Sequence, residues 1–263
     1  MVNLNCLEGI DSVTLRNSIP IPNVGLSILK FCVLLCLVTE SLCAATEPSA
    51  APAETIVENY CTASRAQEHF LQGASMDVEF DASLPKLKKH GRLHALRRIS
   101  PLGLIKYERL SFEGDGTVNH QVIARYLTAE AESQKEQSPS LAVTPRNYKF
   151  KYKGLNKLDG RDVHVFQVAP KRKSQGLFKG EVWIDARTYV RVQESGYLVK
   201  NPSIFLKKVA FVRKYEIRDG ISVPRQVLSV VETRLVGTAE LTIDFTNFSV
   251  DPSQPGTAEA AAQ

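Results

Sequence analysis

Apolar and polar residues alternate through residues 148–196, and this alternation predicts antiparallel strands. Successive side chains of a strand point to opposite faces, so each run has one apolar face and one wet face that carries several lysines. Turn-forming sequences at 158–161, 179–180 and 185–188 separate the runs. The apolar positions are Tyr148, Phe150, Tyr152, Val163, Val165, Val182, Ile184, Val190 and Val192. The segment therefore predicts a meander whose apolar face needs a cover.

Strand patterns also flank this meander on both sides. Before it, they cover residues 76–83, 92–99, 104–112 and 118–127, with a polar break at 84–89 and a hairpin signal at 113–116. After it, they cover residues 207–217, 221–235 and 238–250. The total of ten or eleven strands predicts a sheet long enough to curl.

Two segments have helical patterns. In residues 53–71, Ile56, Tyr60, Ala63 and Phe70 recur at helical spacing, which predicts an amphipathic helix that could cover the sheet. Residues 128–139 are acidic and rich in helix formers, which indicates a short surface helix or a mobile flap. The chain therefore predicts a mainly β (α+β) fold, in which a curved antiparallel sheet forms a half-barrel covered by a few helices.

The two ends of the chain differ in composition from the rest. The apolar run at 31–38 follows Lys30 and is shorter than the ~20 residues that span a bilayer. With small residues at Ala44 and Ala45, this predicts a signal peptide at 1–45. A linker at 46–52, one domain at 53–250 and a disordered tail at 251–263 complete the predicted organisation.

Three alternatives to a cleaved signal peptide stay open. The segment 24–29 could extend the apolar run into an uncleaved membrane anchor, or Cys43 could be lipidated. Because Met1 and Met76 are the only methionines, a true start codon elsewhere is a third alternative. The first two would tether the domain to a membrane, whereas cleavage predicts a periplasmic protein.

Cysteine and charge narrow the function classes. Four of the five cysteines precede Ala44, so cleavage near Ala45 would leave Cys61 alone and no intramolecular disulfide. The net charge of +5 becomes +6 once residues 1–45, with two basic and three acidic residues, are removed. This modest, dispersed charge favours solubility and anionic surfaces and argues against nucleic-acid binding.

Candidate chemistry is sparse. His90 and His94 lie four apart, but in a predicted strand, where that spacing does not converge on a metal. The sequence contains no HExxH, Gly-x-Ser-x-Gly or phosphate-loop motif, so we predict no enzyme, no metal and no cofactor. The basic residues 171–173 indicate either a solvated loop or a contact with anionic head groups or an acidic partner.

Several short motifs of the chain resemble the LolA-like proteins. They are the run at 160–171, the strand end Glu181-Val182-Trp183-Ile184-Asp185, the segment Val190-Arg191-Val192, the segment Val209-Ala210-Phe211 followed by Tyr215, and the turn-strand Asp219-Gly220-Ile221-Ser222-Val223-Pro224. The resemblance covers residues 53–250 in order of elements. It implies a curved antiparallel half-barrel with helices on its concave side over an apolar pocket. The family includes periplasmic carriers of outer-membrane lipoproteins, and related lipid-binding and sensor domains.

The alternation and the resemblance together predict a site without catalytic groups. Its inward-facing candidates are Val78, Phe80, Phe150, Tyr152, Val182, Ile184, Val209 and Phe211, for each of which ordinary core packing is the alternative. We expect a monomeric carrier of lipid or lipoprotein acyl chains, with an inner- or outer-membrane protein as a further partner. An envelope-stress sensor or protein-interaction module on the same scaffold is the second hypothesis, and a secreted enzyme is the third.

Overall fold

The computed structural model describes residues 52–135, 141–202, 205–234 and 237–250 of the 263-residue chain. They all belong to one unit of the chain, residues 49–263. The predictions for the signal peptide, for all of the linker except Pro52, and for the tail lie outside the described residues. Within the described part, no helix has both the length and the apolar character that a membrane crossing requires.

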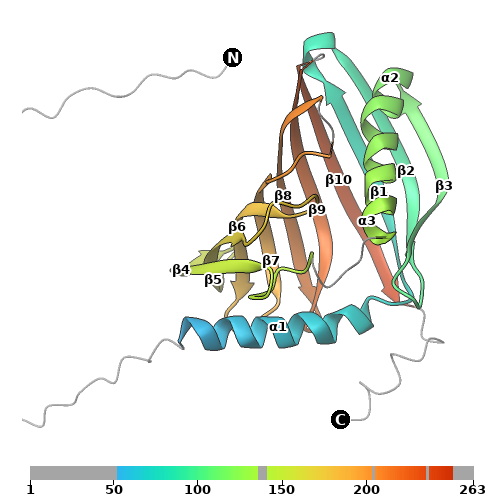
Figure 1. Cartoon of the computed structure of the whole chain (residues 1–263). Coiled ribbons are helices and arrows are strands. Elements are labelled where there is room, and N and C mark those ends of the chain that lie inside the picture. The colour runs from blue at the N-terminus through green and yellow to red at the C-terminus, as the bar shows by residue number, and fades with distance from the viewer. Residues whose placement is uncertain (1–51, 136–140, 203–204, 235–236, 251–263) are drawn as a thin grey trace, which may run out of the picture. The chain divides into compact units, whose positions relative to one another are not determined.

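Ten strands form one open antiparallel sheet in the order β3-β2-β1-β10-β9-β8-β7-β6-β5-β4 (Figure 1). The strands are β1 (Ala74–Leu84), β2 (Lys89–Ile99), β3 (Ile105–Gly114), β4 (Tyr148–Leu158), β5 (Arg161–Pro170), β6 (Phe178–Asp185), β7 (Arg191–Leu198), β8 (Leu206–Arg218), β9 (Ile221–Thr233) and β10 (Thr238–Val250). After β3 the chain crosses to the far edge at β4 and returns strand by strand, until β10 pairs with β1. The predicted mainly β fold with a curved antiparallel sheet is confirmed.

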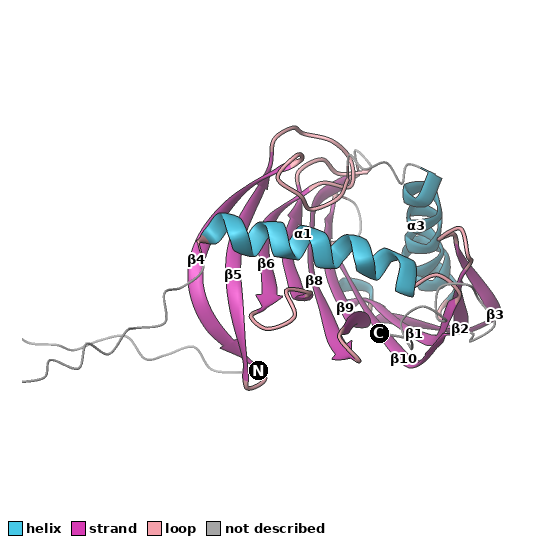
Figure 2. Ribbon diagram, turned by 90° about the horizontal axis from the view of Figure 1, so that it is seen from below, coloured by secondary structure: helices cyan, strands magenta, loops and turns pink. Residues whose placement is uncertain are grey.

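The predicted N-terminal helix is also confirmed, as α1 (Ala53–Phe70). It lies across the strands from β4 toward β9 (Figure 2). Gly73, with φ of 79°, follows the helix, and its N–H donates to the Ile99 carbonyl at the end of β2. This turn leads the chain directly into β1.

The prediction of a strand at 118–127 is wrong, because this segment is helical. A continuous helix runs through α2 (Gly116–Val118), the π-helical η2 (Asn119–Ala124) and α3 (Arg125–Lys135). The hairpin expected at 113–116 is wrong for the same reason. The Asp115 carboxylate accepts hydrogen bonds from the N–H groups of Thr117 and Val118, so this residue caps a helix instead of turning a hairpin. The surface helix predicted from residue 128 is the end of α3, which reaches Lys135.

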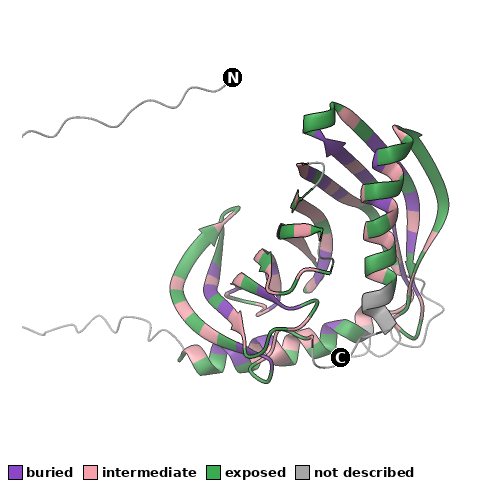
Figure 3. Ribbon diagram, turned by 45° about the horizontal axis from the view of Figure 1, so that its top comes forward, coloured by how far each residue is buried: buried purple, intermediate pink, exposed green. Residues whose placement is uncertain are grey.

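Both helices pack on the same face of the sheet. One row of cross-strand neighbours on this face crosses all ten strands and consists of Tyr152, Phe166, Val182, Glu194, Arg213, Val227, Ile243, Phe80, Leu93 and Phe112. Eight of its members are apolar or aromatic, and burial is greatest beneath the helices (Figure 3). The charged pair Glu194 and Arg213 interrupts the row on β7 and β8.

The core divides into two large clusters on this face. The α3 cluster packs Val118 and Ile123 of the second helix against β1, β2 and β10, around the fully buried Phe80. The α1 cluster packs Ile56 and Tyr60 against β4, β5, β6 and β8. The charged pair therefore lies between two apolar clusters, each covered by its own helix.

Candidate functional site

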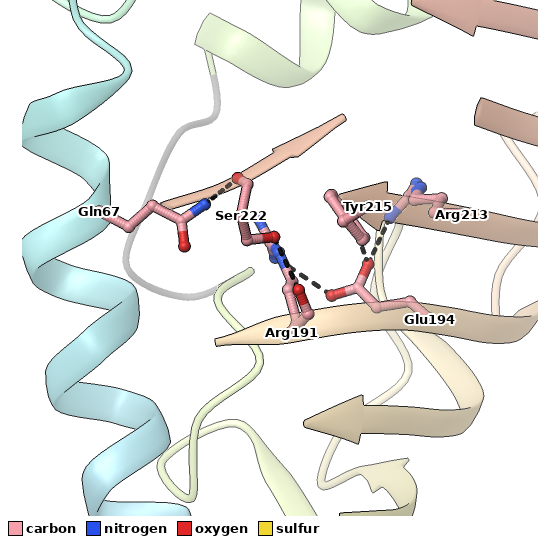
Figure 4. A network of polar contacts seen from close by, with 6 residues as sticks. All are labelled: Gln67, Arg191, Glu194, Arg213, Tyr215 and Ser222. Carbon is pink, nitrogen blue, oxygen red and sulfur yellow. Dashed lines mark hydrogen bonds and ion pairs between the residues drawn. The ribbon is translucent and has the colours of Figure 1, made fainter. Parts of the chain in front are cut away.

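A buried polar network occupies the middle of the helix-covered face (Figure 4). Glu194 of β7 is 1% exposed. Its carboxylate lies 3.1 Å from Nη1 of Arg191 and 3.4 Å from Nη1 of Arg213. The Tyr215 hydroxyl donates a third hydrogen bond to it at 3.2 Å. Every polar group around Glu194 is thus a donor, which favours the ionised carboxylate.

A β-bulge brings two of these groups together. Arg191 and Glu194 are three residues apart, so strict alternation would place them on opposite faces. The pairing of β6 with β7 shifts between Trp183 and Ile184, and this shift puts both side chains on the helix-covered face. Val192, between them, turns to the other face and packs with Val163.

The network carries two guanidinium groups for one carboxylate. Burial alone would raise the pKa of Glu194, but Arg191 and Arg213 outweigh it and hold that pKa below its ordinary value. Burial raises the pKa of Tyr215 to about 12, so its hydroxyl remains a donor at neutral pH. One positive charge is left over, and the side chain of Arg213 is 42% exposed. Its guanidinium lies 4.4 Å from the centre of the Phe211 ring, at the edge of the α1 cluster.

Helix α1 rests over this network. The Gln67 side chain donates a hydrogen bond to the Ser222 carbonyl of β9, and the Ser222 hydroxyl donates to the Arg191 carbonyl at 2.7 Å (Figure 4). Two helical turns toward the N-terminus, Tyr60 is 2% exposed, and the charges of Arg191 and Glu194 act on its hydroxyl. Burial raises the pKa of the Tyr60 hydroxyl. The helix is therefore coupled to the charged centre through β9 and through Tyr60.

An open cleft of about 420 Å³ lies where the C-terminal half of α1 faces the β8–β9 turn. Its lining is mainly apolar and comprises Ala63, Gln67, Phe70, Val190, Asp219, Gly220 and Ile221. The volume is within the range of about 300–1,000 Å³ that small-molecule sites occupy. The cleft and the polar network share Gln67, so a ligand in the cleft would touch the side chain that ties α1 to β9.

The eight residues predicted from the sequence do not form one pocket. Val78 and Phe80 belong to the α3 cluster. Phe150, Tyr152, Val182, Ile184 and Phe211 belong to the α1 cluster or pack against it. Val209 is half-buried and belongs to neither cluster. None of the eight residues lines the cleft. In this structure seven of them pack in the core beneath the helices.

Histidines and carboxylates are dispersed. His90 and His94 are exposed on β2, as the strand pattern predicted. The His164 ring accepts or donates a hydrogen bond of 3.0 Å with the Tyr152 hydroxyl through Nδ1. Among the described residues, no three His, Cys, Asp or Glu side chains are grouped so that they could hold a metal ion. Cys61 is half-buried and packs against the α1 cluster, where burial raises the pKa of its thiol.

The sequence signal for the polar network was partly available. Arg213 lies two or four residues from Val209, Phe211 and Tyr215 along β8, so it shares their apolar face. The position of Arg191 beside Glu194 depends on the bulge and has no such signal.

Comparison with known proteins finds matches among solved structures only, all at low sequence identity. No protein-family model matches the chain, and no curated protein sequence matches it. Among solved structures, a DUF1329 family protein from Desulfovibrio piger is 15% identical, with a TM-score of 0.41 over 79% of this chain and 99% of that one. A LolA superfamily protein from Nitrosomonas europaea is 11% identical, with a TM-score of 0.36 over 77% and 94% of the two chains.

A third similar structure is a putative outer membrane lipoprotein-sorting protein domain from Vibrio parahaemolyticus. It is 11% identical, with a TM-score of 0.40 over 80% of this chain and 99% of that domain. With TM-scores below 0.5 and identities of 11–15%, these matches assign neither a family nor a function to the chain.

Proposed function

We propose that this chain is a periplasmic carrier that binds the acyl chains of a lipid or lipoprotein beneath α1, and so takes part in outer-membrane lipid or lipoprotein transport. The observation that carries the proposal is the apolar cleft between α1 and the β8–β9 turn. A cleft of this kind needs no catalytic group, because an acyl chain gains about 0.8 kcal/mol for each CH₂ that leaves water.

The cleft is the entrance in this proposal, and the α1 cluster is the interior. If α1 swings away from the sheet, the apolar side chains of Phe150, Tyr152, Val182, Ile184 and Phe211 become available to an acyl chain. The acyl chain would replace the apolar contacts between helix and sheet with apolar contacts of its own, so the net free-energy cost of opening is small. Val78, Phe80 and Val209 would extend this face toward β1 and β8 in a wider opening.

The excess positive charge of the network supports an amphiphilic ligand. Arg213 stands between the two apolar clusters, with part of its side chain open to solvent. An anionic or carbonyl-bearing head group could accept hydrogen bonds there while its acyl chains lie on the apolar face. We further propose that the protein acts as a monomer, is secreted through residues 1–45 and meets a membrane protein when it loads or releases its ligand.

Native mass spectrometry, followed by organic extraction, tests the carrier proposal. The protein purified from its natural compartment should carry a mass in the acyl-lipid range that extraction removes. The variant Ala63→Trp, which fills the cleft, should lose most of that mass, whereas Ala66→Trp on the exposed side of the same helix should keep it. A clean unliganded mass, with no uptake of added phospholipid or lipopeptide, would sink the proposal.

A second candidate is a sensor or protein-interaction module. The observation that favours it is edge strand β3, which pairs on one side with β2 and exposes Leu104 beside it and Leu110 and Phe112 within it. Such an edge can accept a strand of a partner protein. A photo-crosslinker at position 110 that captures one specific protein, in a chain that takes up no lipid, would favour this candidate.

A further inference from the structure

The connections that join one strand to the next at one end of the sheet carry only cations, whereas Asp115, which follows β3 at that end, pairs with Lys89 at 3.1 Å. Four of these connections lie there, and the structure describes their residues 85–88, 171–177, 199–202, 205, 234 and 237. Their charged residues are Lys86, Lys88, Lys200, Arg234 and the three basic residues of 171–173, with no Asp or Glu. The strand connections at the other end, 100–104, 159–160, 186–190 and 219–220, contain Asp159, Asp219 and Arg187. The two ends thus carry +7 and −1, and we name the first end the basic rim.

The basic rim is continuous in space. The N–H of Arg234 donates to the Phe205 carbonyl at 3.0 Å, and the N–H of Val199 donates to the Leu177 carbonyl at 3.0 Å. Lys86 lies against Gly237, which joins the β1–β2 connection to the β9–β10 connection. These contacts between neighbouring connections make one surface out of four segments that are distant in the sequence.

Exposed apolar side chains accompany these cations. Leu87 is 43% exposed and Phe205 is 50% exposed, each inside a connection of the basic rim. Tyr197 and Val230, at 40% and 45%, lie in one cross-strand row with Ala210 between them, just behind the rim. The Lys208 ammonium lies 5.7 Å from the centre of the Tyr197 ring. Lysines among exposed aromatic and aliphatic side chains are the composition of surfaces that lie in a membrane interface.

We propose that the basic rim docks the protein on an anionic phospholipid surface. Each lysine or arginine near such a surface contributes to binding, and the effect falls off within a Debye length, so the cations act together only if they face one surface. Phe205 and Leu87 would enter the head-group region between the cations. An acidic protein surface would satisfy the cations equally, but it gives no reason for the exposed Phe205, Leu87 and Val230.

This docking surface is separate from the proposed acyl site. The cleft lies beside the β8–β9 turn, at the opposite strand ends from the basic rim. The docked protein would therefore keep its cleft away from the phospholipid surface. Membrane docking and acyl-chain binding can consequently fail independently of each other.

Vesicle flotation with the full chain tests the docking. We expect binding to phosphatidylglycerol–phosphatidylethanolamine vesicles at 50 mM salt to be roughly tenfold or more stronger than to phosphatidylcholine vesicles, and to weaken at 500 mM salt. The triple variant Lys86→Glu, Lys173→Glu, Lys200→Glu should bind the anionic vesicles about tenfold or more weakly. Phe205→Ser should weaken binding about threefold without changing the net charge.

A control variant with the same net charge separates the basic rim from general electrostatics. Lys106→Glu, Lys153→Glu and Arg225→Glu change three exposed cations on β3, β4 and β9 away from the rim. This variant should bind within about threefold of the unchanged chain, and so should Ala63→Trp, which blocks only the proposed cleft. The N-terminal apolar segment is present in every variant, so it contributes equally. If the triple rim variant does not fold, Lys200→Glu is compared with Lys106→Glu.

Three results would overturn the docking proposal. The first is an equal loss in the rim and control variants, which would mean that net charge alone governs binding. The second is binding that does not depend on anionic lipid. The third is binding to soluble polyglutamate without binding to vesicles, which would assign the basic rim to an acidic protein partner.

Discussion

The two helices cover the same sheet face but are attached to it in different ways. Helix α3 is tied by an ion pair to the buried Arg97, since Nη2 of Arg97 lies 3.4 Å from Oε1 of the half-buried Glu130, and the Tyr107 hydroxyl donates to the other oxygen of that carboxylate. Ahead of it, the Asn119 side chain donates to the Glu113 carbonyl at 2.9 Å. Helix α1 rests on the sheet through apolar side chains and through the hydrogen bond from Gln67 to Ser222.

The difference indicates which half of the face can open. A buried ion pair is directional, and separating it leaves charges without partners in an apolar setting. Apolar contacts are not directional, so an acyl chain can replace them at little cost. The open cleft borders α1, the helix that is held mainly by apolar contacts. We therefore expect α1 to be the mobile cover and α3 to be the fixed one.

The largest expected effect is on the fixed half. Glu130→Ala leaves Arg97, which is 7% exposed, without its carboxylate, and should lower the free energy of unfolding by about 3 kcal/mol. Chemical denaturation measures this change. The matched control is Glu108→Ala, because Glu108 forms an exposed ion pair of 3.0 Å with Arg98 that should be worth less than about 1 kcal/mol. Equal losses in the two variants would mean that α3 is not anchored by its buried pair.

The charged centre beneath α1 should show an intermediate effect. Glu194→Gln keeps the shape of the side chain but leaves two guanidinium groups with a neutral partner, and should cost about 2 kcal/mol of stability at pH 7. Glu232→Gln, an exposed position on β9, is the control and should change stability by less than about 0.5 kcal/mol.

The same variant has a pH signature. The pKa of Glu194 is lower in the folded chain than in the unfolded chain, where it is about 4.3. The stabilisation is therefore complete above that unfolded value and is lost as pH falls through the folded value. In Glu194→Gln, the decline in stability below about pH 4.3 should be shallower than in the unchanged chain. Parallel curves for the two proteins would show that the carboxylate does not titrate with this network.

Most strands were predictable because one face of the sheet meets water. Alternation survives wherever a strand has a wet side, as in residues 149–153, where exposed lysines alternate with half-buried rings. The segment 118–127 was wrongly predicted as a strand, because its apolar residues are dense enough to fit both the strand period of two and the helical period of 3.6. The capping residue Asp115 and the spacing of Val118, Val122 and Tyr126 were the helical signals.

The site was less predictable than the fold. Alternation grouped the apolar candidates on one face of the sheet, but it could not show that α1 and α3 would already cover that face. It also could not show which helix borders a cleft, because the cleft forms between α1 and the distant β8–β9 turn. The pairing of Arg191 with Glu194 depends on a register shift between β6 and β7, and a single strand's pattern contains no information on its partner's register.

The smallest effect is the most direct test of the contrast between the helices. Gln67→Leu removes the hydrogen bond to the Ser222 carbonyl while keeping an apolar side chain against the sheet, and should cost about 1 kcal/mol. Because this bond ties only α1, amide hydrogen exchange should speed up about fivefold in residues 60–70 and remain unchanged in residues 125–131. Gln121→Leu, exposed on the other helix, is the control and should alter neither segment. Equal acceleration in both helices would mean that the two covers open as one unit, and an acyl chain could then enter only through a global opening of the domain.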